Sequence, residues 1–143
     1  MDGAERAEIV HERDPTTEDV ARVRAGLMTF NEAAVGPATI SRHAWYLKDS
    51  DGQVRGGLVG FLAWRWLSID LLWVDEPLRG QGHGRTLLQR AEDEARSAGC
   101  VGARLDTYEF QARPFYERLG YEVFGVLDGY PAGTRTYHMK KAL

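Results

Sequence analysis

A glycine-rich loop between a strand pattern and a helix pattern carries the clearest chemistry in this sequence. Residues 69–74 are apolar apart from Asp70, and the loop Arg79-Gly80-Gln81-Gly82-His83-Gly84 follows them shortly before a helical pattern begins. The first N–H groups of a helix are unpaired and carry partial positive charge, so they can hold an anion such as phosphate. Gly82 and Gly84 add no Cβ atom that would keep a ligand from the backbone. This stretch therefore predicts a phosphate-holding loop.

Asp70 is a charged residue inside that apolar strand. Strand alternation predicts that its side chain shares a face with Leu72 and Val74. A buried carboxylate there could take a proton from a bound ammonium through water, or serve as the counter-charge of the ammonium. The alternative is an ion pair with Arg65 or Arg104 across the sheet.

A second candidate carboxylate is Asp106, near the end of the strand expected after the helix. Histidines are the other side chains suited to proton transfer near neutral pH. We interpret His83 as a loop residue rather than a base. For His11, His43 and His138 the sequence indicates no partner.

Length and composition limit the classes of function. The 143 residues predict a single domain over residues 1–143, with 43% hydrophobic and 27% charged residues. A net charge of −3 gives no support to nucleic-acid binding, so an anionic ligand has to be held by local geometry. Cys100 is the only cysteine, which excludes an internal disulfide and a metal site of several cysteines. Without a signal-like start or a long apolar run, we expect a cytoplasmic protein that uses neither metal nor membrane.

The pattern of apolar residues predicts a mixed α/β sheet with helices on its faces. A helix begins at Thr16 or Thr17 and ends at Gly36. Glycines 56, 57 and 60 within one strand suggest a bulge or the close approach of another backbone. The strand, helix and strand that follow predict a parallel, right-handed crossover. The expected strands are 8–12 (a weak pattern), 42–48, 54–67, 69–74, 101–107, 121–127 and 134–140, and the later helices follow the glycine loop and cover 111–119.

Two motifs together resemble the GNAT superfamily of N-acetyltransferases. Arg79 to Gly84 fits R/Q-x-x-G-x-G/A, the acyl-CoA pyrophosphate motif of that family, with Val74 five residues before it. Ala112-x-x-Phe115-Tyr116-x-x-x-Gly120-Tyr121 resembles the second family signature. The resemblance spans about residues 6–141. Residues 69–76 with 110–112 look like a group of small bacterial members whose substrates are mostly unassigned.

The resemblance implies a GNAT fold, a mostly antiparallel central sheet with one parallel, splayed strand pair. It also implies acetyl-CoA as co-substrate, with the pantetheine arm added as a strand beside residues 72–74. Glu109 stands where many members have an Asn near the cofactor, so Gln111 is expected to substitute. The residues expected to bind the cofactor are Leu72, Trp73, Val74, Arg79, Gly80, Gln81, Gly82, His83, Gly84, Arg85, Thr86, Gln111 and Phe115. Arg79 either adds charge or pins the loop.

The implied reaction is direct transfer of an acetyl group to a primary amine. Tyr116 matches the family tyrosine that protonates the leaving thiolate, and the alternative is a core tyrosine packed beside Phe115. A backbone N–H on the strand before the loop, such as that of Val74, would stabilise the oxyanion. Asp70 and Asp106 favour a small cationic acceptor.

Other interpretations stay open at this stage. A non-catalytic acyl-CoA-binding sensor or partner module would show the same cofactor residues. Nucleotide binding at the glycine loop is disfavoured, because no Gly-Lys-Ser/Thr follows. The sequence leaves the identity of the acceptor undecided, and also whether strand 134–140 pairs across a homodimer.

Overall fold

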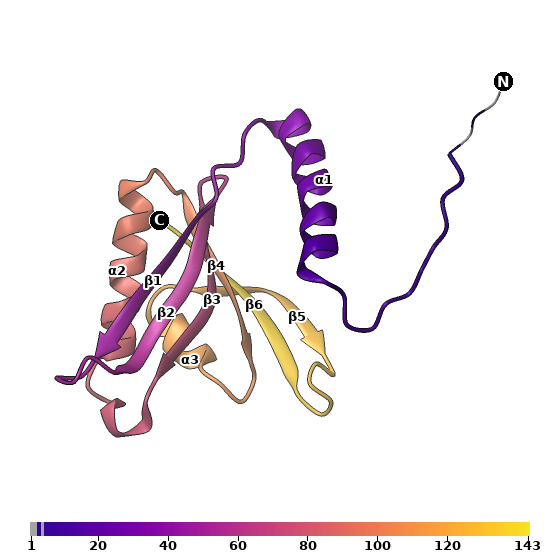
Figure 1. Ribbon diagram of the computed structural model, residues 1–143. Coiled ribbons are helices and arrows are strands. Elements are labelled where there is room, and N and C mark those ends of the chain that lie inside the picture. Colours follow the sequence, from indigo (N-terminus) through magenta and orange to yellow (C-terminus); the bar gives the residue numbers. More distant parts are fainter. Residues whose placement is uncertain (1–2, 4) are drawn as a thin grey trace. The chain divides into compact units, whose positions relative to one another are not determined.

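The computed structural model describes Gly3 and residues 5–143, and the chain divides into two compact units, Met1–Ala38 and Thr39–Leu143. The first unit contains helix α1 (Thr17–Val35) (Figure 1). Thr16 caps it, because its hydroxyl oxygen accepts the Asp19 N–H at 3.2 Å, and Gly36 ends it with φ of 87°. Both ends agree with the sequence. The strand expected at residues 8–12 is wrong, because this segment pairs with no other strand.

The second unit is a six-stranded mixed sheet with helices, which confirms the predicted fold class. The strand order is β1-β2-β3-β4-β6-β5, and only β3 and β4 run parallel. The crossover between them is helix α2, as expected. The elements are β1 (Ser41–Lys48), β2 (Val54–Ala63), β3 (Trp66–Val74), the 3₁₀ turn η1 (Glu76–Leu78), α2 (His83–Ser97), β4 (Gly102–Tyr108), α3 (Arg113–Arg118), β5 (Glu122–Asp128) and β6 (Arg135–Ala142).

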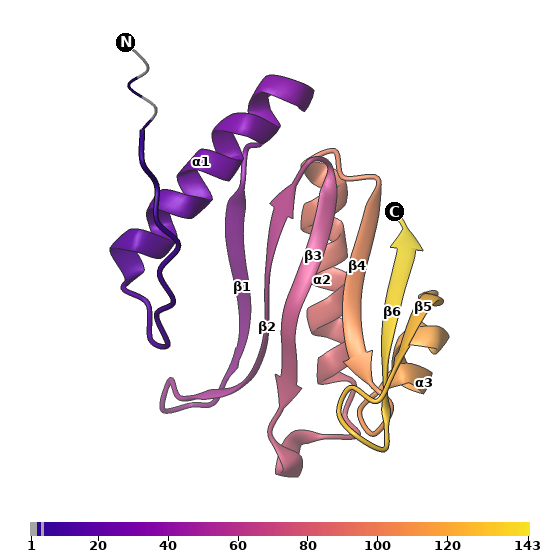
Figure 2. The same cartoon turned by 90° about the vertical axis from the view of Figure 1, so that its right-hand side faces the viewer.

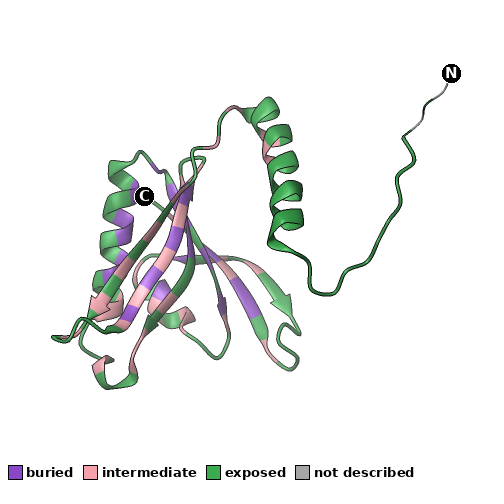
Figure 3. Cartoon of the chain, viewed as in Figure 1, coloured by how far each residue is buried: buried purple, intermediate pink, exposed green. Residues whose placement is uncertain are grey.

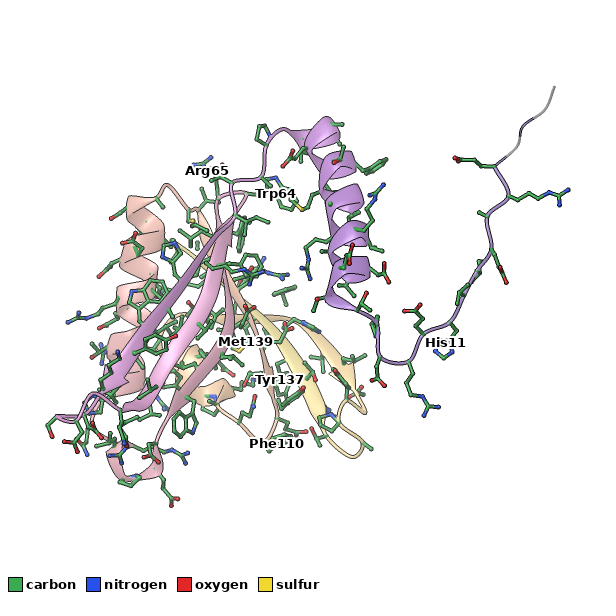
Figure 4. All side chains as sticks on the ribbon, in the orientation of Figure 1. His11, Trp64, Arg65, Phe110, Tyr137 and Met139 are labelled. Carbon is green, nitrogen blue, oxygen red and sulfur yellow. The ribbon has the colours of Figure 1, made fainter. Side chains whose placement is uncertain are left out.

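The turn between β2 and β3 lies earlier in the chain than the sequence suggested. The strand expected to reach Leu67 ends at Ala63, and Trp64 and Arg65 form the turn with φ of 47° and 64°. Figure 4 labels both residues at that turn. Two-residue hairpin turns with positive φ usually use Asn or Gly, so a Trp-Arg turn leaves no signal in the sequence.

One face of the sheet carries the hydrophobic core. Helix α2 buries four residues expected on its apolar face, namely Leu87, Leu88, Ala91 and Ala95. They form one cluster with inward residues of the sheet and with Tyr116 of α3. Figure 3 shows the buried stripe of α2 turned toward the strands. Both helices therefore cover the same side of the sheet. Among the described residues, no helix is both long and apolar enough to cross a membrane.

A buried carboxylate ties α2 to the C-terminal half of the sheet. Glu92 accepts a hydrogen bond from the Tyr121 hydroxyl at 2.9 Å and pairs with Lys141 Nζ at 2.9 Å. Burial and the adjacent Glu92 raise the pKa of Tyr121 well above its ordinary value. The Lys141 ammonium and the Tyr121 hydroxyl both pair with the Glu92 carboxylate. The helix can therefore bury this glutamate on the face that packs against the strands.

Strand β3 contains a bulge. Ile69 pairs with Gly60 and Leu71 with Val59, so Asp70 has no partner in β2. The glycine is needed there, because a Cβ on Gly60 would clash with the Ser68 carbonyl oxygen. The close approach that the strand glycines suggested is therefore present, and the extra residue resets the alternation of side chains beyond it.

The two parallel strands separate after four pairs. Their pairing runs from Trp66↔Gly102 to Ile69↔Leu105 and then stops, although β3 continues to Val74 and β4 to Tyr108. Figure 2 shows the far ends of β3 and β4 apart. This is the splayed pair that the family resemblance implied.

The last strand is inside the sheet. β6 pairs with β4 on one side and with β5 on the other, so the edges of the sheet are β1 and β5. β6 therefore offers no free edge to a second copy of the chain.

Candidate active site

A cleft of about 920 Å³ opens where β3 and β4 separate. It is lined by residues 69–74 of β3 and 105–108 of β4, by Arg79 and Gly84 of the loop, by 110–112, 115 and 116, and by Tyr130 and Thr136. Most of the residues expected to act on the cofactor thus meet around one space. Figure 4 labels Phe110 near the open ends of these strands. The remaining loop residues, Gly80 to His83 with Arg85 and Thr86, adjoin the cleft without lining it.

The loop presents a row of unpaired N–H groups. Gly80 and Gly82 have φ of 76° and 83°, a left-handed conformation that glycine adopts without strain. Within the described chain, the N–H groups of residues 81–85 donate no hydrogen bond to protein. The N–H and hydroxyl of Thr86 both donate to the Gly82 carbonyl at 3.0 Å. The available anion donors therefore lie before Thr86, at the N-terminus of α2.

Arg79 is held against the strand that precedes it. Its Nε donates to the Val74 carbonyl at 2.8 Å, so of the two roles considered for Arg79 the structure contains the contact that pins the loop. The Asp75 N–H donates to the Arg55 carbonyl in β2. Backbone groups alternate sides along a strand, so the N–H of Val74 and the amide groups of Leu72 point to the edge that faces the cleft. That edge has no strand partner in β4.

The two sequence motifs touch each other in the fold. A Cβ built on Gly84 would lie 3.4 Å from the ring of Phe115. Phe115 packs edge-on against Tyr116, with ring centroids 5.1 Å apart. The loop that could hold phosphate and the tyrosine that could donate a proton are thereby fixed relative to one another.

Tyr116 fits both roles that the sequence suggested, a core tyrosine and a proton donor at the site, since it belongs to the core cluster and also lines the cleft. Its side chain is 7% exposed, and burial raises its pKa to about 12. In the described chain its hydroxyl donates to no other residue. Every fully buried side-chain oxygen of the described residues has a hydrogen-bond partner, so the unpartnered Tyr116 hydroxyl must be in part accessible. The phenol therefore stays protonated and opens to the cleft.

Asp70 is placed differently from the prediction. The bulge turns Leu72 and Val74 toward the core, whereas Asp70 is exposed. The shared face and the burial are therefore both wrong. The alternative ion pair is absent from the described chain as well, because Arg65 donates to a backbone carbonyl at 3.1 Å and Arg104 to a serine hydroxyl at 3.0 Å. Asp70 is left as an exposed negative charge at the cleft.

Asp106 has a partner that the sequence did not indicate. His138 Nδ1 lies 2.6 Å from Asp106 Oδ1, across the β4–β6 ladder in which the two residues are direct partners. A carboxylate accepts, so Nδ1 carries the proton of this hydrogen bond, and in the neutral ring the lone pair then lies on Nε2. β4 and β6 are neighbours in the sheet but far apart in the sequence, so residue spacing alone could not predict this pair.

The side chain of Gln111 secures the end of β4. Its Oε1 accepts from the Tyr108 N–H at 2.9 Å and from the Thr107 hydroxyl at 3.2 Å. Tyr108 stacks on Phe110 and meets Tyr130 edge-on, which forms an aromatic wall that the sequence did not single out. Gln111 lines the cleft, and its amide nitrogen donates to none of the described residues.

Comparison with known proteins agrees with this geometry. The profile of the Acetyltransferase (GNAT) family matches residues 9–121. The chain therefore belongs to the GNAT family of acetyltransferases, enzymes that take the acetyl group from acetyl-CoA.

Similar proteins include named and provisionally assigned acetyltransferases. The blasticidin-S acetyltransferase of Streptomyces morookaense is 43% identical over 102 residues, which are 71% of this chain and 75% of that protein. A crystal structure from Agrobacterium tumefaciens, provisionally assigned as an acetyltransferase, has a TM-score of 0.91 and 34% identity and covers 96% of this chain and 100% of that one. A protein from Bacillus anthracis strain Ames, provisionally assigned as a streptothricin acetyltransferase, was solved with acetyl coenzyme A; it has a TM-score of 0.63 and 22% identity, covers 80% of this chain and 68% of that one, and shares the fold.

Proposed function

We propose that this chain transfers the acetyl group of acetyl-CoA directly to a primary amine of a small, cationic acceptor. The observation that carries the proposal is the cleft between β3 and β4, where unpaired loop N–H groups, an open strand edge and a protonated tyrosine border one space. Acetyl-CoA supplies an activated acyl group as a thioester. The residues of the chain bind it, orient it and move protons.

The pyrophosphate, the pantetheine arm and the sulfur of the cofactor each have a candidate partner in the chain. The N–H groups of residues 81–85 suit the pyrophosphate, because they are unpaired and lie at a helix N-terminus. The outward amides of Leu72 and Val74 suit the amides of the pantetheine arm, which would continue the sheet as an added strand. Among them the Val74 N–H is also our candidate donor to the oxyanion. Tyr116 then donates to the departing sulfur.

Two negatively charged side chains that line the cleft support a cationic acceptor. Asp70 and Asp106 both line the cleft, and both are exposed. Exposed carboxylates attract an ammonium group without a large desolvation cost. The relative from Streptomyces morookaense acts, by its name, on blasticidin S, which supports a small antibiotic as one member of the acceptor panel.

The test is a thiol-release assay with acetyl-CoA and a panel of amines. The panel contains blasticidin S, a polyamine, an aminoglycoside, a peptide with a free N-terminus and, as an acidic control, an amino acid with a carboxylate side chain. We expect release with one or more cationic amines, and a product heavier by one acetyl group. Binding of acetyl-CoA without release for any amine would instead support the acyl-CoA-binding module.

A further inference from the structure

We infer that His138 is the general base of the reaction, that it removes the proton of the acceptor ammonium at Nε2, and that Asp106 positions it. This inference rests on the proposed amine acetylation. It assigns to a histidine, rather than to Asp70 or Asp106, the step that needs a proton acceptor. The observations that carry it are the geometry of the pair and a second, smaller cleft beside it.

The second cleft has a volume of about 180 Å³ and is lined by Ser68, Ile69, Asp70, Arg104, Leu105, Asp106, Phe124 and His138. Four of these residues, 69, 70, 105 and 106, also line the larger cleft. They surround the last pair of the parallel ladder, where β3 and β4 separate. The two clefts therefore adjoin at this pair, so a small amine in the second cleft would lie next to the space proposed for the thioester.

The geometry of the pair leaves one nitrogen of His138 available. Nδ1–H donates to Asp106 Oδ1 at 2.6 Å, and in the described chain Nε2 has no hydrogen-bond partner. The ring is further bounded by Phe124, whose centroid lies 6.2 Å away. A carboxylate that holds one ring nitrogen fixes the tautomer and stabilises the imidazolium that forms when the other nitrogen takes a proton. Figure 4 labels Tyr137 and Met139, the neighbours of His138 on β6.

The charges around His138 come from four strands. They are Asp70 on β3, Arg104 and Asp106 on β4, Glu122 on β5 and Lys140 on β6. Arg104 is engaged with Ser68, and Lys140 lies 3.9 Å from Glu122. Ser68 is neutral, so Arg104 keeps its positive charge, and the second cleft presents two carboxylates, Asp70 and Asp106, against one guanidinium. The two carboxylates favour the ammonium that delivers the proton.

The proton balance closes with groups already placed. The ammonium gives one proton to His138 Nε2, and the free amine attacks the acetyl carbonyl carbon to form the C–N bond. The C–S bond then breaks while Tyr116 donates a hydrogen bond to the sulfur, and the proton that the nitrogen loses in becoming the amide ends on that sulfur. His138 passes its proton to solvent, so the net reaction releases amide, thiol and one proton.

The test is the pH dependence of kcat/KM in His138→Gln, with an acceptor identified by thiol release. We expect a loss of about 10²- to 10⁴-fold near neutral pH, because this is the usual contribution of a general base to the rate. The loss should shrink as the pH approaches about 10, where a primary amine increasingly supplies its own free base. Imidazole added to His138→Ala should restore part of the activity. Asp106→Asn should lower kcat/KM less than His138→Gln does, and its loss should also shrink as the pH rises.

Several results separate this inference from its alternatives. His43→Gln is the matched control, because His43 pairs with Ser41 on β1, outside both clefts, at 2.8 Å. If His138→Gln acetylates amines as fast as the wild type at every pH, then His138 is not the general base, but the proposed function stands. A loss of equal size at every pH, without imidazole rescue, also overturns the assignment of His138 as the base and indicates a structural pair. A wild type that binds acetyl-CoA and acetylates none of the amines overturns both proposals.

Discussion

Replacing Tyr116 with phenylalanine removes one oxygen from the wall of the cleft and should slow turnover without weakening cofactor binding. The hydroxyl donates to no described residue, so its removal breaks no internal hydrogen bond there. With a pKa of about 12, the phenol would give its proton to a thiolate of ordinary pKa near 8.5 at a cost of about 5 kcal/mol. Tyr116 therefore helps mainly as a hydrogen-bond donor to the departing sulfur.

The size of the effect follows from that role. A hydrogen bond to a charged group contributes about 1.5 to 3 kcal/mol, which corresponds to a roughly 10- to 100-fold loss of kcat. We expect the dissociation constant of acetyl-CoA to change by less than about twofold, because a donor that acts at the leaving group adds little to ground-state binding. The acid must be protonated, and burial raises its pKa, so kcat should show no alkaline fall below about pH 10 from this group.

The assay is thiol release under saturating acceptor, with acetyl-CoA binding measured by calorimetry. The chain itself adds little background, since Cys100 is its only cysteine and burial raises the pKa of that thiol. Tyr121→Phe is the matched control, because Tyr121 is equally buried but bonds to Glu92 outside the cleft. An unchanged kcat in Tyr116→Phe, or an equal loss of kcat and of affinity, would refute the donor role.

Three further changes test other parts of the structure. Gly82→Ala should raise the dissociation constant of acetyl-CoA and cost about 1 to 2 kcal/mol of stability, since φ is 83° there; Gly52→Ala, with φ of 78° in the β1–β2 turn, should cost the same stability without changing affinity. Asp70→Asn should raise KM for a cationic acceptor by roughly two- to fivefold, as expected for an exposed ion pair, with kcat unchanged; no change for any cation would contradict the counter-charge role. Lys141→Met should cost about 3 kcal/mol in thermal unfolding because it leaves the Glu92 carboxylate buried without its cation, whereas Lys140→Met, at an exposed pair with Glu122, should cost less than about 0.5 kcal/mol.

The sequence alone determined what depends on local order along the chain. The glycine loop, the helix that follows it and the signature at Ala112–Tyr121 are contiguous, so residue type and spacing define them. The sequence predicted the ends of α1 for the same reason, because Thr16 and Gly36 form hydrogen bonds with residues close to them in the chain. These local features were enough to predict the fold class and the family, although the strand expected at 8–12 is absent and the turn at Trp64 and Arg65 gave no signal.

Tertiary structure decided which side chains meet and which way they face. One extra residue in β3 reversed the exposure of Asp70 relative to Leu72, and strict alternation cannot show a bulge. The insertion of β6 between β4 and β5 set His138 against Asp106, thirty-two positions away in the chain. Pairing between distant strands is fixed by burial and hydrogen bonding of the whole sheet. The sequence thus defined the loop that we propose holds the cofactor, whereas the fold placed the groups that we propose move protons during the reaction.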